Sequence, residues 1–207
     1  QDYNPETDGV PYEQMEELDQ WALHQLQGLT KRIVSAYETF DFHLVYHHLH
    51  NFCVLDLSSF YLDIIKDRLY TSPQTSTQRR SAQFAMNEIL ETLVRLMAPI
   101  LAFTADEIWQ YMGGEDRSPS VHADVFSPLK EVFLNPDLAG RWDEILAVRK
   151  EVTKTLELGR KEKIIGHPLD AAVTLGVSPE LDEKLSAYAD QLSSIFIVSS
   201  VILTDID

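Results

Sequence analysis

Residues 18–40 read LDQWALHQLQGLTKRIVSAYETF, and this stretch decides the class of fold. Its apolar side chains recur at steps of three and four residues, which places them on one side of an α-helix. They are Leu18, Ala22, Leu26, Leu29, Ile33, Ala36 and Phe40. The pattern predicts a long amphipathic helix that buries this side against other helices.

Two more long helices are predicted after the first. Asp41 is a candidate N-cap for a second helix that ends before the break at Thr71–Pro73. A third apolar series runs from Ala82 to Met97 and stops at Ala98–Pro99, because a helix cannot continue through proline without a kink. The expected buried side of the second helix consists of Phe42, Val45, Leu49, Phe52, Cys53, Phe60 and Ile64.

A short helix and a long one complete the predicted helical part. Thr104 and Glu107 have the spacing of a capping box, so a short helix is expected before Gly113–Gly114. Residues 115–136 hold three prolines without periodicity, which indicates an extended connection across the bundle. Asp137 is then a candidate cap for a helix with an apolar side. That side consists of Trp142, Ile145, Val148, Val152 and Leu156.

The pattern changes after Gly166. Residues Ala171–Val177 and Ile195–Leu203 are rich in β-branched side chains and predict two strands. A helix that starts at Ser178–Glu180 separates them. The expected fold is therefore mainly α: a helical bundle followed by a small α+β appendage. We expect one domain over residues 1–136, and a long basic helix with a strand-helix-strand subdomain over residues 137–207.

The charge pattern bears on partners. A formal net charge of −16 argues against a protein that coats nucleic acid nonspecifically. One stretch alone is basic, on the helix expected after Asp137. Its cations are Arg149, Lys150, Lys154, Arg160, Lys161 and Lys163. Two interpretations stay open at this point, a solvated helix surface and a local contact with phosphates.

Catalytic and metal-binding patterns are sparse. His43 and His47 share one side of a helix, but no glutamate follows His43 and no clustered cysteines lie nearby, so we expect no metal. Asp56, Asp63 and Asp67 form a carboxylate stripe that ion pairing or solvent explains. The sequence holds no phosphate-binding glycine motif and no paired nucleophile and base.

Aromatic and cationic side chains near the expected helix ends suit single-stranded RNA, which proteins bind by stacking on bases and neutralising phosphates. The same aromatic residues could also belong to a helical core. From residue chemistry alone, an RNA-binding bundle and a protein-interaction bundle both remain open. The residues concerned are Tyr61, Arg68, Tyr70, Arg79, Arg80, Trp109 and Tyr111.

Residues 51–70, NFCVLDLSSFYLDIIKDRLY, closely resemble the signature helix of isoleucyl-tRNA synthetases. Valyl and leucyl enzymes share the bundle, but FYLDIIKDRLY is similar to the isoleucine enzyme. The resemblance extends along nearly the whole chain. It includes residues 2–5 (DYNP), 10–12 (VPY), 18–23 (LDQWAL), 79–83 (RRSAQ), 97–109 (MAPILAFTADEIW), 120–122 (SVH), 146–152 (LAVRKEV) and 163–166 (KIIG).

This resemblance implies a class I synthetase whose catalytic domain and editing insertion lie N-terminal to residue 1. The whole enzyme would use ATP and Mg²⁺, and family members often continue into a four-cysteine zinc module that this sequence does not contain. We expect no cofactor in this stretch of chain and no catalysis by it alone. The sole cysteine, Cys53, and the lack of a long apolar run fit a cytoplasmic protein outside membranes.

The implied role is to dock the anticodon stem-loop of isoleucine tRNA, with the rest of the synthetase chain as the other partner. Two alternatives are a helical protein-interaction domain without an RNA role and the equivalent region of a valyl-type synthetase. Charge and position, not a family match, select the expected tRNA-binding residues. They are Arg68, Tyr70, Arg79, Arg80, Arg149, Lys150, Lys154, Arg160 and Lys161.

Overall fold

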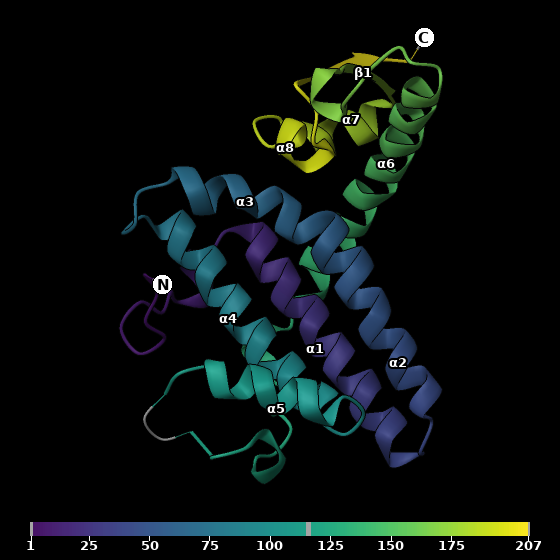
Figure 1. The fold of residues 1–207 in the computed structure, drawn as a ribbon. Coiled ribbons are helices and arrows are strands. Elements are labelled where there is room, and N and C mark those ends of the chain that lie inside the picture. The colour runs from purple at the N-terminus through teal and green to yellow at the C-terminus, as the bar shows by residue number, and fades with distance from the viewer. Residues whose placement is uncertain (1, 115–116, 207) are drawn as a thin grey trace. The chain divides into compact units, whose positions relative to one another are not determined.

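The structure is a computed structural model that describes residues 2–114 and 117–206. It divides into two compact units, Gln1–Ala139 and Gly140–Asp207. The expected fold class is confirmed, because helices dominate and a small parallel sheet of two strands follows them (Figure 1).

The first unit is a bundle built around α1 (Glu17–Glu38), the helix predicted from residues 18–40. Figure 1 shows α1 between α2 and α4, and it packs against both. Its Leu23, Leu26, Leu29 and Ile33 have no exposed surface. The other helical elements of this unit are α2 (Phe42–Asn51), η2 (Phe52–Tyr61), α3 (Leu62–Thr71), α4 (Thr77–Met97) and α5 (Ala102–Tyr111).

The second predicted helix is continuous from residue 42 to residue 71, but its middle element η2 is a π-helix. A π-helix has i→i+5 hydrogen bonds and more residues in each turn than an α-helix. Residues that face the core are therefore farther apart in the sequence. The buried residues Phe52, Leu57 and Tyr61 follow that spacing. Beyond η2 the buried position is Ile65.

Part of the buried side predicted for the second helix is therefore wrong. Ile64 and Cys53 are only partly buried. Phe42 is 49% exposed, since it lies in the first turn of α2. The buried positions that the α-helical spacing missed are Leu57, Tyr61 and Ile65.

Two predicted helix caps are wrong. The helix α5 begins at Ala102 without a side-chain cap, so Thr104 lies inside its first turn rather than before it. The helix α6 (Pro136–Lys161) begins at Pro136, and the Asn135 side chain accepts a hydrogen bond from the Leu138 N–H (3.0 Å). Proline at the first helical position needs no hydrogen-bond acceptor, which moves the cap from Asp137 to Asn135.

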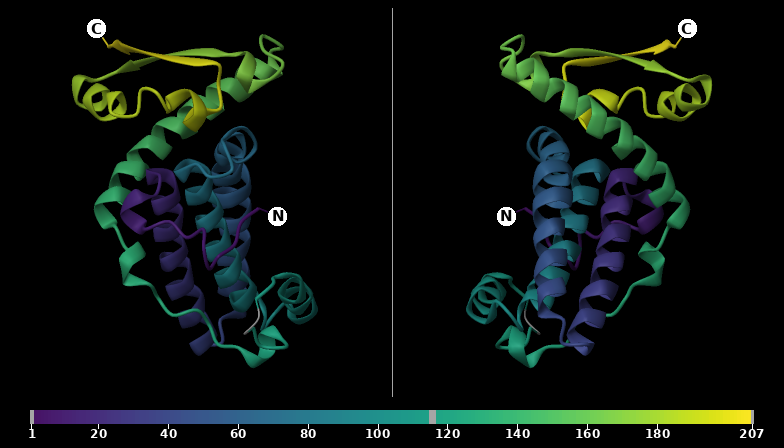
Figure 2. Two further views of the ribbon diagram at one scale, coloured as in Figure 1. Left: turned by 90° about the vertical axis from the view of Figure 1, so that its left-hand side faces the viewer. Right: turned by 90° about the vertical axis from the view of Figure 1, so that its right-hand side faces the viewer.

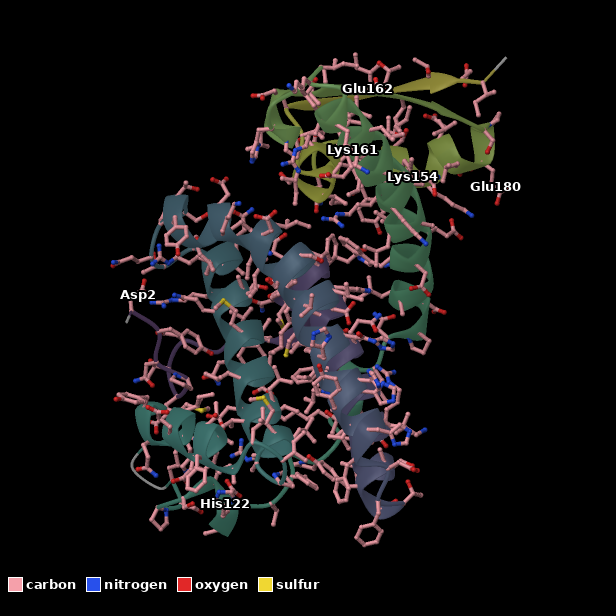
Figure 3. The ribbon with its side chains drawn as sticks, turned by 45° about the vertical axis from the view of Figure 1, so that its right-hand side comes forward. Asp2, His122, Lys154, Lys161, Glu162 and Glu180 are labelled. Atoms are coloured by element: carbon pink, nitrogen blue, oxygen red, sulfur yellow. The ribbon has the colours of Figure 1, made fainter. Side chains whose placement is uncertain are left out.

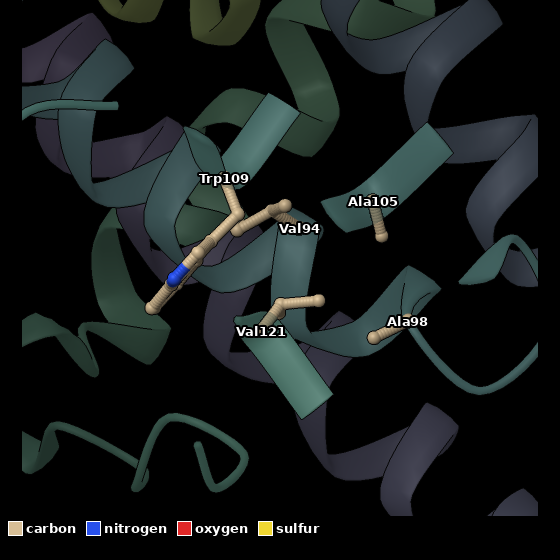
Figure 4. Packing of buried hydrophobic residues seen from close by; sticks show 5 residues of the cluster. All are labelled: Val94, Ala98, Ala105, Trp109 and Val121. Carbon is tan, nitrogen blue, oxygen red and sulfur yellow. The ribbon is translucent and has the colours of Figure 1, made fainter. Parts of the chain in front are cut away.

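The end of the bundle is closed by a cluster in which α5 packs against α4 and the segment after it (Figure 4). Trp109 is the largest member and is 2% exposed. Its indole Nε1 donates to the Ser118 carbonyl (2.8 Å). The other buried members are Val94, Ala98, Ala105 and Val121.

The described part of the connection, residues 117–135, follows the bundle as expected. It forms two short 3-10 turns, Val121–Ala123 and Glu131–Phe133. Side chains of α1 hold it in place: Gln27 accepts from the Lys130 N–H (2.8 Å), and His24 Nδ1 accepts from the Asn135 N–H (2.9 Å). These two bonds fix the segment from which α6 starts.

The second unit combines most of α6 with a small βαβ arrangement. Strands β1 (Ala172–Val177) and β2 (Ser200–Asp205) are parallel, with Ala172 opposite Ser200. Figure 2 shows the two strands side by side. Between them lie α7 (Pro179–Ser186) and α8 (Leu192–Phe196). The predicted helix start is confirmed, because the Ser178 side chain accepts from the Leu181 N–H.

The second strand was placed too early, since residues 195–199 are not part of it. Ile195 and Phe196 belong to α8 and are 1% and 2% exposed. Ile197 has φ of 57°, a left-handed conformation that ends α8. Leu192 therefore starts its own short helix instead of ending the one that Ser178 caps. The β-branched run from Ile195 to Leu203 is therefore divided between two elements, α8 and β2.

Tyr37 is expected to make the stability of the bundle sensitive to alkali. Its hydroxyl donates to the Leu96 carbonyl (2.8 Å), its ring stacks on Phe126 (centroids 5.5 Å apart), and burial raises its pKa to about 12. A group whose pKa is raised in the folded state stabilises the fold below its unfolded pKa of about 10 and stops doing so as the pH rises through the folded value. We expect the free energy of unfolding, measured in urea, to fall between pH 10 and 12. The Tyr37→Phe variant should show a shallower fall, and an unchanged pH dependence would contradict this role.

Candidate nucleic-acid interface

The basic surface predicted on α6 forms one line along the helix. Lys150, Lys154 and Lys161 are separated by four and seven residues, which places them on the same side. All three are exposed, and Figure 3 shows Lys154 and Lys161 on this helix. Among the described residues, Lys150 and Lys161 make no ion pair, while Lys154 lies 3.5 Å from Glu151. The line thus presents positive charge that the protein leaves largely uncompensated.

An open pocket of about 480 Å³ lies where α6 ends. Arg160 lines it but is paired with Glu157 (2.7 Å), so its charge is partly neutralised. Lys163 adds a further cation and lies in a left-handed turn with φ of 60°. The lining residues are Glu157, Arg160, Lys161, Lys163, Ile165 and Gly166. The selection of expected tRNA-binding residues omitted Lys163, although its place in the basic stretch would have justified it.

Arg149 differs from its basic neighbours on α6. Its Nε donates to the carbonyl of Ile195 (2.9 Å), near the end of α8. This bond links α6 to α8 inside the second unit. Arg149 therefore has a structural contact that Lys150, the next residue, does not share.

Arg68 is held inside the first unit by Asp19 of α1. Its Nη2 and Nη1 donate to the two carboxylate oxygens of Asp19 at 2.9 and 3.1 Å, and Asp19 has no exposed surface. Tyr61 and Ser81 donate to the same carboxylate, at 2.8 and 2.5 Å. Burial alone would lower the pKa of Arg68, but Asp19 outweighs it and the pKa is raised. Arg68 is therefore one member of a four-residue buried network.

Arg79 and Arg80 hold the N-terminal segment to the start of α4. Arg79 pairs with the Asp2 carboxylate (2.7 Å), and Arg80 pairs with Asp8 (3.4 Å). Gln83 also donates to Asp2 (2.9 Å). Figure 3 shows Asp2 beside α4. These two arginines are 17% and 16% exposed, so their guanidinium groups are mostly occupied by the protein itself.

The aromatic residues separate into two groups. Tyr70 at the end of α3 and Tyr111 at the end of α5 are 85% and 86% exposed. Their rings can accept a stacked base. Tyr61 and Trp109 are 0% and 2% exposed, so for these two residues the core interpretation, one of the two left open by the sequence, is the right one. Both are large enough that the bundle uses them as core residues.

The histidines and carboxylates of the second helix were the other candidates for chemistry in the sequence. In residues 2–114 and 117–206, no group of three or more His, Cys, Asp and Glu side chains is placed to hold a metal ion. Asp63 pairs with Lys66. Burial raises the pKa of Asp56, and Arg32 partly offsets that effect. None of the helices described is both long and apolar enough to cross a membrane.

Comparison with known proteins identifies the family of this chain. Residues 19–175 match the family described as the anticodon-binding domain of tRNA ligase. The chain belongs to this family. The match covers the bundle, the connection, α6 and most of β1, so both the lysine line and Tyr70 lie inside the anticodon-binding domain.

Individual relatives agree with the resemblance carried by residues 51–70. The chain is 50% identical over 99% of its length to the isoleucine–tRNA ligase of Geobacter sulfurreducens. It is 51% identical over 98% of its length to that of Syntrophotalea carbinolica, and 48% identical over 97% to that of Moorella thermoacetica. It spans 22% of the length of each. The chain thus corresponds to the anticodon-binding region of these ligases.

Proposed function

We propose that this chain docks the anticodon stem-loop of isoleucine tRNA as part of an isoleucine–tRNA ligase. The ligase would attach isoleucine in the cytoplasm with ATP and Mg²⁺ bound outside these residues. The observation that carries the proposal is the identity of about half over nearly the whole chain to isoleucine–tRNA ligases, within a family of anticodon-binding domains.

The chemistry of the exposed residues supports a division of labour. Lysines along α6 would neutralise phosphates, because contacts to the RNA backbone supply affinity without reading sequence. Tyr70 would stack on an unpaired base. Arg68 would act indirectly, since its ion pair with Asp19 holds α3, the helix that carries Tyr70. Arg79 and Arg80 would also act indirectly, since their ion pairs hold the N-terminal segment to α4.

A helical protein-interaction domain is the other candidate, and tRNA binding separates the two. The test is filter binding of isoleucine tRNA at several salt concentrations, with an unrelated tRNA as competitor. Preferential binding of isoleucine tRNA supports the proposal. Equal competition by the unrelated tRNA, or no binding at low salt, contradicts it.

The double variant Lys150→Ala/Lys154→Ala tests the lysine line. We expect weaker binding of every tRNA, and the slope of log affinity against log salt should fall by about 0.7–0.9 for each lost phosphate contact. A net charge of −16 means that general attraction cannot supply this binding.

A matched control removes two lysines that carboxylates already neutralise. Lys66 pairs with Asp63, and Lys184 pairs with Glu144 and Glu180. The variant Lys66→Ala/Lys184→Ala changes the net charge equally but should leave the salt slope unchanged. If both double variants reduce the slope alike, the effect is one of total charge and the lysine line has no special role.

A further inference from the structure

We propose that the outer side of α2 and η2 is a docking surface for another part of the ligase. We define this apolar face by Tyr46, His47, His50, Val54, Leu55 and Leu62. The proposal rests on the proposed function only in that the chain is part of a larger ligase. It concerns residues other than those of the lysine line and other than Tyr70.

The apolar face exposes large side chains that a folded protein normally covers. Leu55 is 58% exposed, Val54 is 44% and Leu62 is 40%. Tyr46 is 56% exposed, and its ring lies 5.3 Å from that of His47 and 5.6 Å from that of His50. The exposed polar residues among them, Asn51, Ser58 and Ser59, are uncharged. Groups of exposed apolar side chains mark interaction sites more often than single exposed residues do.

The same stretch is depleted of charge. Residues 42–62 contain one charged residue, Asp56, although 24% of the chain is charged. Asp56 is partly buried, and Arg32 lies close enough to lower its pKa against the effect of burial. Desolvation also lowers the pKa of His48, and electrostatic interactions with Arg32 and His47 lower it further, which favours a neutral His48 ring. Interface cores show this composition: few charges, with aromatic side chains enriched.

The π-helix contributes to the same side. Val54 and Leu55 both lie in η2, which supplies exposed apolar residues outside while Phe52, Leu57, Phe60 and Tyr61 fill the core. π-helical segments are rare and occur frequently at functional sites. A ten-residue π-helix behind an exposed uncharged surface is therefore a second sign that this side has a partner.

Charge excludes several occupants. RNA needs lysine or arginine for its phosphates. Residues 42–62 contain neither, and Arg32 of α1, which lies near them, interacts with the carboxylate of Asp56. A membrane surface prefers a helix with basic residues beside the apolar ones. A second copy of the chain would bring another net charge of −16 against the first. An uncharged surface of the same ligase meets none of these objections.

The relatives supply the source of such a surface. The chain spans 22% of the length of the isoleucine–tRNA ligases it matches, so most residues of such an enzyme lie outside it. Interfaces between domains of one chain bury surfaces of moderate size that suit one exposed helix side. We therefore infer that a largely uncharged, apolar surface of the remaining ligase covers Val54, Leu55 and Leu62.

Hydroxyl-radical footprinting tests this without RNA. The labelling rates of Tyr46 and Leu55 are compared between the 207-residue chain and the complete ligase that carries it. We expect labelling of both residues to be several-fold slower in the complete ligase. Equal rates in the two proteins would overturn the proposal, and so would protection that appears only after tRNA is added.

A substitution adds an energetic test. Leu55→Asp should leave the melting temperature of the 207-residue chain unchanged, because Leu55 is exposed there, but lower that of the complete ligase and restore rapid labelling of Tyr46. The matched control is Leu158→Asp on α6, where leucine is 52% exposed, and it should change neither protein. A second copy of the chain is the other occupant to test. If labelling of the apolar face in the 207-residue chain slows as its concentration rises, and the measured mass becomes that of a dimer, the surface binds a second copy and the proposal is overturned.

These outcomes are independent of tRNA binding. If the complete ligase protects the apolar face but the chain fails to bind isoleucine tRNA, the proposed function fails and the docking surface stands. If the chain binds isoleucine tRNA and the apolar face is labelled equally in both proteins, the docking surface fails and the proposed function stands.

Discussion

The Asp19→Ala variant is expected to lose about 3–5 kcal/mol of the free energy of unfolding, because it removes one partner of a buried ion pair. Asp19 is fully buried and accepts hydrogen bonds from Arg68, Tyr61 and Ser81. Alanine leaves all three donors without their acceptor. The Arg68 side chain is only 20% exposed, so water cannot replace the carboxylate fully.

The position of this network explains why the loss should spread through the bundle. Asp19 lies on α1, Tyr61 at the end of η2, Arg68 on α3 and Ser81 on α4. Ser81 Oγ also accepts from the Glu16 N–H (2.9 Å) at the start of α1. Burial, followed by the Asp19 charge, raises the pKa of Tyr61 well above 10, so the phenol stays a donor at neutral pH. One carboxylate thus orients four helical elements.

Urea unfolding of Asp19→Ala measures the loss. Two controls separate a buried charge from a general effect. Asp63→Ala removes a carboxylate whose ion pair with Lys66 is exposed, and it should cost less than about 1 kcal/mol. Adding Arg68→Met to Asp19→Ala should recover part of the loss, since no unpaired charge stays buried. A loss below about 1 kcal/mol for Asp19→Ala would contradict the network's role.

The sequence predicted those elements whose side chains signal them locally. The three- and four-residue spacing from Leu18 to Ala36 is found in α1, and Ser178 with Pro179 marks the start of α7. Phe40 was wrongly included in the buried side, because α1 ends at Glu38 and Phe40 is 76% exposed. The π-helix gave no such signal. Apolar residues occur on all sides of residues 52–61, so the pattern could not show which spacing the core selects.

The strand predicted over residues 195–203 was partly wrong for a related reason. Ile195 and Phe196 have strand propensity, yet the second unit buries them in a helix, because tertiary packing decides between the two for so short a segment. Without the fold, the β-branched content of residues 195–203 was the only guide.

Charge in the sequence alone does not show which cations of the candidate site are exposed and which are paired inside the protein. Arg68 and Lys150 are equally cationic in the sequence, but the acceptor of Arg68 lies 49 residues away on α1, where no local pattern connects them. Lys150 has no ion-pair partner in the described residues, a fact that requires the positions of all its neighbours. Family resemblance located the domain, and only the structure separated exposed cations from occupied ones.

The Trp109→Ala variant should lose a comparable amount, about 3–5 kcal/mol, because it empties the largest position of a closed cluster. The indole is 2% exposed and two guanidinium groups lie over its ring, that of Arg117 at 4.3 Å and that of Arg95 at 4.7 Å from the ring centroid. Glu91 pairs with both arginines, and Arg95 also pairs with Asp124 (3.0 Å). Burial would raise the pKa of Glu91, but hydrogen bonds from Arg117 and Arg95 outweigh it and lower the pKa.

Removing Trp109 therefore removes the surface on which two cations rest, together with the hydrogen bond to Ser118. We expect faster amide hydrogen exchange in residues 117–124 as well as a lower urea midpoint. Trp109→Phe keeps a ring for the cations but not the Nε1 donor, so its loss should be smaller, about 1–2 kcal/mol. Tyr111→Ala is the matched control: it removes an aromatic ring from the same helix that is 86% exposed, and it should change stability by less than about 0.5 kcal/mol. If Tyr111→Ala costs as much as Trp109→Ala, weakening of helix α5 itself explains the loss, and the contacts of Trp109 with Arg95 and Arg117 do not explain it.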